Sequence, residues 1–107
     1  MSLAKSELVH RIVGHILAVC EPFKIILFGS YAQGRHNEHS DIDLLVVCES
    51  VFRRRMLERK VKSDIRRYGL KSDVLVRSSK EVEAELKRPN SFLSSVVKKG
   101  VIIYKKG

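Results

Sequence analysis

Two aspartates, Asp41 and Asp43, stand two residues apart at the start of an apolar run that extends from Ile42 to Val47. Aspartate is disfavoured in strands, and a buried carboxylate without a partner is energetically costly. Because side chains two apart on a strand point the same way, both carboxylates are expected to face one side of a sheet. Carboxylate oxygens placed in this way suit a divalent cation such as Mg²⁺.

A second polar feature, Gly29-Ser30, follows the apolar run from Lys24 to Phe28, which is typical of a short buried strand. Glycine lets a backbone approach a ligand closely, and Ser30 is expected to open a short helix over residues 30–33 whose first N–H groups suit phosphate. A phosphate site on one strand end and a carboxylate pair on the next are what metal-assisted nucleotidyl transfer requires. In the two-metal scheme the ions lie about 3.5–4 Å apart.

At these residues the chain resembles the minimal nucleotidyltransferases, a family within the DNA polymerase beta superfamily. The residues that match are Phe28-Gly29-Ser30-Tyr31-Ala32, then Gly34, and then Ser40-Asp41-Ile42-Asp43-Leu44-Leu45-Val46. The resemblance covers nearly the whole chain. It implies a nucleotidyltransferase fold, two Mg²⁺ ions held by Asp41, Asp43 and a third carboxylate on a later strand, and ATP positioned by Gly29 and Ser30. Asp73 is the only acid in the apolar run from Lys71 to Val76 and is assigned as that third carboxylate.

The same resemblance implies an activity and a partner. The activity is transfer of a nucleoside monophosphate, AMP from ATP, onto an acceptor hydroxyl, with Asp73 also serving as the base for that hydroxyl. Many relatives have a basic residue where Gln33 stands, and here Arg35 lies two positions later, so Arg35 is the expected nucleotide-binding cation. The usual partner in the family is a HEPN-type ribonuclease toxin, on which family members adenylylate a tyrosine and so act as antitoxins.

The elements that would position these residues follow from apolar periodicity and turn signals. We predict helices over residues 2–20, 30–33, 51–68, 78–87 and from 90 or 91 to 99, and strands over 24–28, 42–47, 71–77 and 101–104. Ser50 is the expected cap of helix 51–68, and Phe52 and Met56 are placed on its inward stripe. Phe92 and Val97 are placed inward on the last helix, and Gly100 is predicted as its C′ residue. This order implies an α/β (α+β) fold, a small mixed sheet with helices packed on it.

The composition bounds the class of protein. A chain of 107 residues predicts one domain over residues 1–107, with no apolar run near the ~20 residues of a membrane span and no signal-peptide pattern. Cys20 and Cys48 form no C-x-x-C pair and are expected to be ordinary thiols of a cytoplasmic protein. A net charge of +9 favours phosphate-rich partners or an acidic protein.

Several features of the sequence are compatible with more than one function. The basic side of helix 51–68 is either a solvated face or a docking face for an acidic partner or RNA, although no interleaved aromatic residues support sequence-specific RNA recognition. His36 and His39 are three apart, as in some transition-metal sites, but solvated side chains are favoured for both; His10 and His15 are assigned to scaffold. The alternatives to the transferase described above are a non-catalytic antitoxin subunit and a small-molecule nucleotidyltransferase. A second copy of the chain is a further candidate partner.

Overall fold

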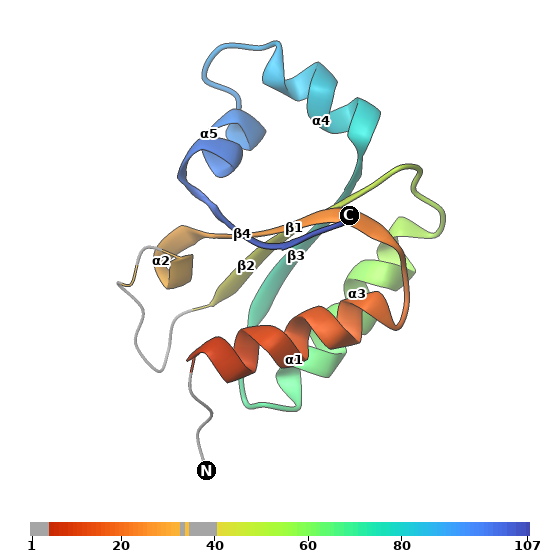
Figure 1. The fold of residues 1–107 in the computed structure, drawn as a ribbon, viewed down its shortest axis with the longest axis vertical. Helices are drawn as coiled ribbons and strands as arrows, with labels where there is room; N and C mark the ends of the chain where they lie inside the picture. Colours follow the sequence, from red (N-terminus) through yellow and green to blue (C-terminus); the bar gives the residue numbers. More distant parts are fainter. Residues whose placement is uncertain (1–4, 33, 35–40) are drawn as a thin grey trace.

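The computed structural model describes residues 5–32, 34 and 41–107 of the chain, and its elements follow the predicted order (Figure 1). The helices are α1 (Lys5–Leu17), α2 (Gly29–Ala32), α3 (Arg54–Arg66), α4 (Ser79–Leu86) and α5 (Phe92–Lys99). The strands are β1 (Pro22–Phe28), β2 (Ile42–Cys48), β3 (Ser72–Ser78) and β4 (Val101–Lys105).

The strands form one mixed sheet in the order β3-β2-β1-β4, which confirms the predicted fold class. Strand β1 is antiparallel to β2 and to β4, whereas β2 and β3 run parallel. Figure 1 shows α1 and α3 covering one face of the sheet and α4 and α5 the other, with α2 at the end of β1. The central strand β2 is therefore covered on both faces.

This two-sided burial explains the continuous apolar run of β2. Leu44 and Val46 pack into the core under α1 and α3, while Leu45 and Val47 pack into the smaller core under α4 and α5. Because alternate side chains face opposite sides of a sheet, Asp43 shares the side of Leu45 and Val47. It lies at the open end of the α4/α5 face.

The predicted boundaries of two helices are wrong. Helix α1 ends at Leu17 rather than at residue 20, and the chain then passes through a turn into β1. Helix α3 begins at Arg54, because its N-cap Arg53 adopts a left-handed conformation with φ 56°, and no side chain caps it, so Ser50 is not the cap. Phe52 and Met56 are 77% and 58% exposed, so neither belongs to an inward stripe.

The C-terminal elements match the predictions more closely, with two corrections. Ser78 and Glu81 form the predicted capping box of α4, and Ser91 caps α5. Phe92 is 59% exposed and Val97 also lies at the surface, so neither is an inward residue of α5. Gly100 is the C-cap itself with φ −77° in an extended conformation, not a left-handed C′ residue.

The acidic residues of α3 point inward and fix this helix in place. Asp64 is 3% exposed; it accepts a hydrogen bond of 2.9 Å from Lys60 and lies 3.7 Å from His15 of α1. Glu58 accepts a 2.9 Å hydrogen bond from the backbone N–H of Val76. This bond gives a partner to a backbone donor of β3, which is an edge strand of the sheet. Neither acid therefore lies on the basic outer face of the helix.

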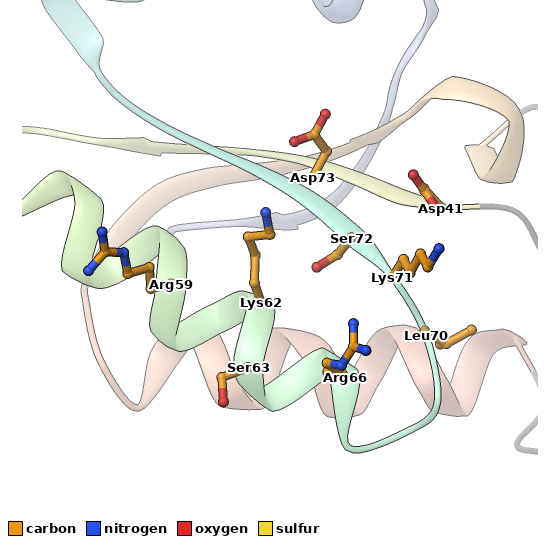
Figure 2. Close-up of a pocket in the computed structure, with 9 residues that line it drawn as sticks. All are labelled: Asp41, Arg59, Lys62, Ser63, Arg66, Leu70, Lys71, Ser72 and Asp73. Carbon is orange, nitrogen blue, oxygen red and sulfur yellow. The ribbon is translucent and has the colours of Figure 1, made fainter.

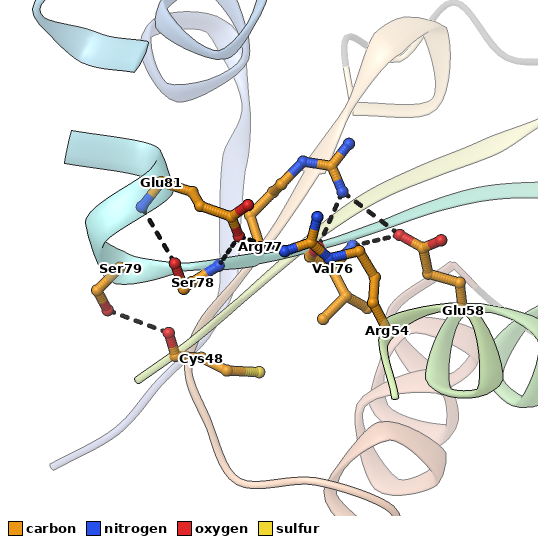
Figure 3. A network of polar contacts seen from close by, with 8 residues as sticks. All are labelled: Cys48, Arg54, Glu58, Val76, Arg77, Ser78, Ser79 and Glu81. Atoms are coloured by element: carbon orange, nitrogen blue, oxygen red, sulfur yellow. Dashed lines mark hydrogen bonds and ion pairs between the residues drawn. The ribbon is translucent and has the colours of Figure 1, made fainter. Parts of the chain in front are cut away.

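A polar network continues from this contact to the start of α4 (Figure 3). Arg54 donates a 2.6 Å hydrogen bond to Glu81, whose carboxylate also accepts a 2.8 Å bond from the backbone N–H of Ser78. Arg77 lies 3.5 Å from Glu58, and the hydroxyl of Ser79 donates to the Cys48 carbonyl. Helix α3 is thereby held along the outer edge of β3.

No helix within the described ranges is both long and apolar enough to cross a lipid bilayer.

Candidate functional site

Three strand ends meet at one edge of the sheet, and the predicted site residues lie there. Phe28, the last residue of β1, pairs with Asp43 of β2, and Asp43 in turn pairs with Asp73 of β3. The two aspartates are 30 positions apart in the sequence and occupy neighbouring positions of a parallel pair, where side chains point to the same side. The pairing register therefore brings Asp43 and Asp73 together beside the end of β1.

Gly29 lies directly against the carboxylate of Asp43. Its φ of 76° is in the left-handed region, and a Cβ added to it would overlap Oδ2 of Asp43. Glycine is therefore required twice over at this position, once for its backbone conformation and once for the approach of the carboxylate. The Gly-Ser motif and the Asp-x-Asp motif, separate in the sequence, form one site.

The three aspartates also influence one another electrostatically. Partial burial is the largest cause of a raised pKa at Asp43, followed by the negative charges of Asp73 and then Asp41. Asp41 and Asp73 are exposed, and Asp43 is half-buried. Within the described ranges, no three His, Cys, Asp or Glu side chains are already arranged as ligands of one metal ion. The carboxylates are therefore close enough to repel one another, but among the described residues they are not arranged as a complete set of ligands for one metal ion.

A cavity of about 600 Å³ adjoins the aspartates on the side of β3 and α3 (Figure 2). Its lining is mostly polar or charged and consists of Asp41, Arg59, Lys62, Ser63, Arg66, Leu70, Lys71, Ser72 and Asp73. Figure 2 shows Asp41 and Asp73 pointing to the side of β3 away from α3, while Lys62 extends from α3 toward the edge of that strand. The basic residues of this helix are evident in the sequence, but no local pattern indicates that they lie beside the aspartates.

Other predicted site residues fall outside what the structure describes. Ser30 belongs to α2, but its side chain is not described. Arg35, His36, His39 and Ser40 lie between the described ranges, so the predicted nucleotide contact of Arg35 stays a prediction. His15, assigned to scaffold, accordingly lies between α1 and α3, where its ring nitrogen is 2.8 Å from the Tyr68 hydroxyl.

The same fold is found in solved structures of other proteins. A structure titled as a toxin-antitoxin with AMP-PNP superposes with a TM-score of 0.62 at 20% identity, covering 96% of this chain and 75% of that one. A structure titled as a tri-AMPylated Shewanella oneidensis HEPN toxin in complex with MNT antitoxin gives a TM-score of 0.58 at 15% identity, covering 94% and 73%. At these identities the likeness concerns the fold.

Sequence relationships give the family. The family model described as "Nucleotidyltransferase domain" matches residues 12–103, and the chain belongs to that family of enzymes. A Methanocaldococcus jannaschii protein named "Putative protein adenylyltransferase MJ1305" is 34% identical over 110 residues, which cover 92% of this chain and 73% of the relative. A second protein of that organism, with the same descriptive name and the designation MJ0141, is 38% identical over 53 residues, half of this chain and 52% of the relative.

Proposed function

We propose that this protein transfers AMP from ATP, with the help of two Mg²⁺ ions, onto a hydroxyl group of a partner protein. The observation that carries the proposal is the position of Asp43, which lies against Gly29 on one side and pairs with Asp73 on the other. Nucleotidyl transfer requires a backbone that phosphate can approach closely and carboxylate oxygens for a divalent cation. Both are thus present at one end of the sheet.

The donor atoms fit the proposed metal. Magnesium prefers oxygen ligands and is usually held by one or two carboxylates together with substrate phosphates. Asp41, Asp43 and Asp73 offer only carboxylate oxygens. Burial, and then the charges of Asp73 and Asp41, raise the pKa of Asp43, so a cation bound here would favour its ionised form. Bound Mg²⁺ would neutralise negative charge on the phosphate oxygens in the transition state.

The residues of this chain have separate tasks in the transfer. The backbone at Gly29 and Ser30 positions the triphosphate, and the three aspartates orient the reacting groups. The acceptor oxygen attacks the α-phosphorus of ATP, the bond from that phosphorus to the bridging oxygen breaks, and pyrophosphate leaves with the bonding electrons. Asp73 is exposed and is the one of the three aspartates that lies on the edge strand β3; it accepts the proton of the attacking hydroxyl.

The proposed partner is a HEPN-type toxin with a tyrosine as acceptor, which this protein would neutralise as its antitoxin. Support comes from the relatives named as protein adenylyltransferases and from the fold of the MNT antitoxin solved with an AMPylated HEPN toxin. A separate protein acceptor also agrees with the open end of the sheet, where Asp41 and Asp73 are exposed.

The test is transfer of label from α-labelled ATP to a protein in a lysate of the source organism. We expect one labelled acceptor in the presence of Mg²⁺, and a loss of at least about 100-fold for Asp43→Asn and for Asp73→Asn. Glu83→Gln, on the exposed surface of α4, removes one carboxylate away from the site and is the matched control. No label from the wild type, together with no Mg²⁺-dependent ATP binding in calorimetry, would leave the non-catalytic antitoxin subunit as the better hypothesis.

A stability measurement separates a functional role of Asp43 from a structural one. A raised carboxyl pKa means that the ionised form is disfavoured in the folded protein, so stability falls as pH rises past the ordinary aspartate pKa. Asp43→Asn removes this charge, and we expect a free energy of unfolding at neutral pH, without Mg²⁺, equal to or above that of the wild type. A clear loss of stability would show that Asp43 serves the fold.

A further inference from the structure

Three basic residues of α3 form one row along the edge of the sheet. Arg59, Lys62 and Arg66 are spaced i, i+3 and i+7, which places them on one side of the helix. Together with Lys71, which precedes β3, they line the cavity of about 600 Å³ next to Asp41 and Asp73. Figure 2 shows these side chains extending from α3 and from the start of β3 around that space.

These four cationic side chains have no ionic partner among the residues that the structure describes. Two other cations of α3 are paired, Arg54 with Glu81 and Lys60 with Asp64. None of the side chains of Arg59, Lys62, Arg66 and Lys71 forms an ion pair or hydrogen bond with any residue that the structure describes. The acids of α3 are turned inward, so neither of them pairs with the outer row. The cavity is lined by these four cations and by only two carboxylates, those of Asp41 and Asp73, and the excess of positive charge attracts anionic ligands.

The cavity lies on the acceptor side of the site. In the sheet order β3-β2-β1, Gly29 follows β1 and touches Asp43, whereas the cavity is lined by Asp73 of the edge strand β3 and does not include Gly29. If the triphosphate occupies the Gly29 side, the group that approaches Asp73 comes from the β3 edge. This step rests on the proposed function, in which Asp73 receives the proton of the acceptor hydroxyl.

The lining of the cavity favours a polypeptide over a nucleic acid. Its side chains are basic, acidic or serine apart from Leu70, and none is aromatic, so no surface for stacking bases is present among the lining residues. The hydroxyl oxygen of Ser72 is buried and lacks a hydrogen-bond partner within the described residues, which leaves a donor at the cavity wall. From Arg59 to Arg66 the helix advances roughly 10 Å, a length that about three residues of an extended peptide span.

We infer that the row Arg59, Lys62 and Arg66, with Lys71, binds an acidic segment of the acceptor protein that flanks the acceptor hydroxyl. Carboxylates of this segment pair with the row on α3. The segment then continues past the edge strand β3, to the side on which the Asp73 carboxylate lies, and the hydroxyl is placed there. The row on α3 thus selects acceptors by the negative charge around the modified residue.

The test measures binding without catalysis and then transfer. The probe is a fluorescent peptide of glutamates around one tyrosine, compared with the same peptide carrying glutamines and with single-stranded oligoadenylate RNA. Anisotropy is recorded at low and high salt for the wild type and for Arg59→Gln/Lys62→Gln/Arg66→Gln. The matched control is Lys80→Gln/Lys87→Gln/Lys105→Gln, which removes the same net charge from exposed positions that do not line the cavity.

We expect the glutamate peptide to bind more tightly than the glutamine peptide, and the cavity variant to weaken that binding roughly 10-fold while the control stays near wild type. The difference should shrink at high salt, because exposed charge pairs are screened. Equal binding by the two triple variants, or by the two peptides, overturns the inference. Tighter, cavity-dependent binding of the RNA overturns the assignment to a polypeptide.

Transfer assays with the same variants keep this inference separate from the proposed function. Cavity-dependent peptide binding without label transfer to any acceptor supports the acidic-segment site and counts against the transferase. Label transfer to the natural acceptor at equal rates by both triple variants supports the transferase and counts against the acidic-segment site. Urea unfolding of both triple variants confirms that the fold is kept.

Discussion

The contact between Gly29 and Asp43 leads to a test in which two glycines with the same backbone conformation are compared. Gly29 and Gly69 both have φ 76°. A Cβ at Gly29 would overlap the carboxylate of Asp43, whereas a Cβ at Gly69 would meet no atom within 4 Å. Alanine at either position therefore strains the backbone equally, but only alanine at Gly29 displaces Asp43.

The expected magnitudes differ between stability and activity. A left-handed conformation costs a residue with a Cβ about 1–2 kcal/mol, and part of this is offset because alanine restricts the unfolded chain. We expect both Gly29→Ala and Gly69→Ala to lose about 1 kcal/mol of unfolding free energy, a fall in Tm of roughly 4–8 °C for a domain of this size. Gly29→Ala should in addition lose at least about 100-fold in label transfer, since Asp43 is moved from its position between Gly29 and Asp73.

The assay combines urea unfolding with transfer from α-labelled ATP, both at a temperature where each variant is folded. Gly69→Ala reports the effect of backbone strain alone. If Gly29→Ala transfers label as fast as Gly69→Ala, the close approach of Gly29 to Asp43 has no role in the reaction, and the central geometric argument for the site is wrong.

Three further measurements test other parts of the structure. Burial and the adjacent Cys48 thiol raise the pKa of Cys20 from 9.0 to about 11. Alkylation of Cys20 by iodoacetamide near pH 8 should therefore be about 100-fold slower than that of a free peptide thiol. An equal rate would contradict this environment. Asp64→Ala removes a buried carboxylate that accepts from Lys60, and we expect urea unfolding to show a loss of about 1–3 kcal/mol, whereas no change would show that the pair is unimportant. The backbone N–H of Ser78, and then Arg54, lower the pKa of Glu81 from 4.5, so ionised Glu81 stabilises the fold above that pH and the gain disappears as pH falls through the folded-state value. The stability difference between wild type and Glu81→Gln should therefore shrink in acid, and a constant difference would argue against the bond to Ser78.

Local patterns predicted the order of the elements well, because each depends on neighbours along the chain. The apolar runs gave the strands, and the Ser78–Glu81 capping box was placed correctly. The start of α3 was wrong, since the left-handed turn at Arg53 has no signal in its residue type. Phe52 and Met56 fitted the helical spacing of a buried stripe, yet packing leaves both at the surface.

For the site, the sequence alone determined which residues are available: a glycine after one strand, two aspartates around the start of another and a third in a later apolar run. Only the tertiary structure decided that Asp43 lies against Gly29 and beside Asp73, because strand pairing joins residues far apart in the chain and its register is a long-range property. It also decided how the charges of α3 divide, with Glu58 and Asp64 taken up by β3 and α1 and the row of cations left beside the aspartates. Helical periodicity shows which residues share a side of a helix, but the partner that each side meets depends on the packing of the whole fold.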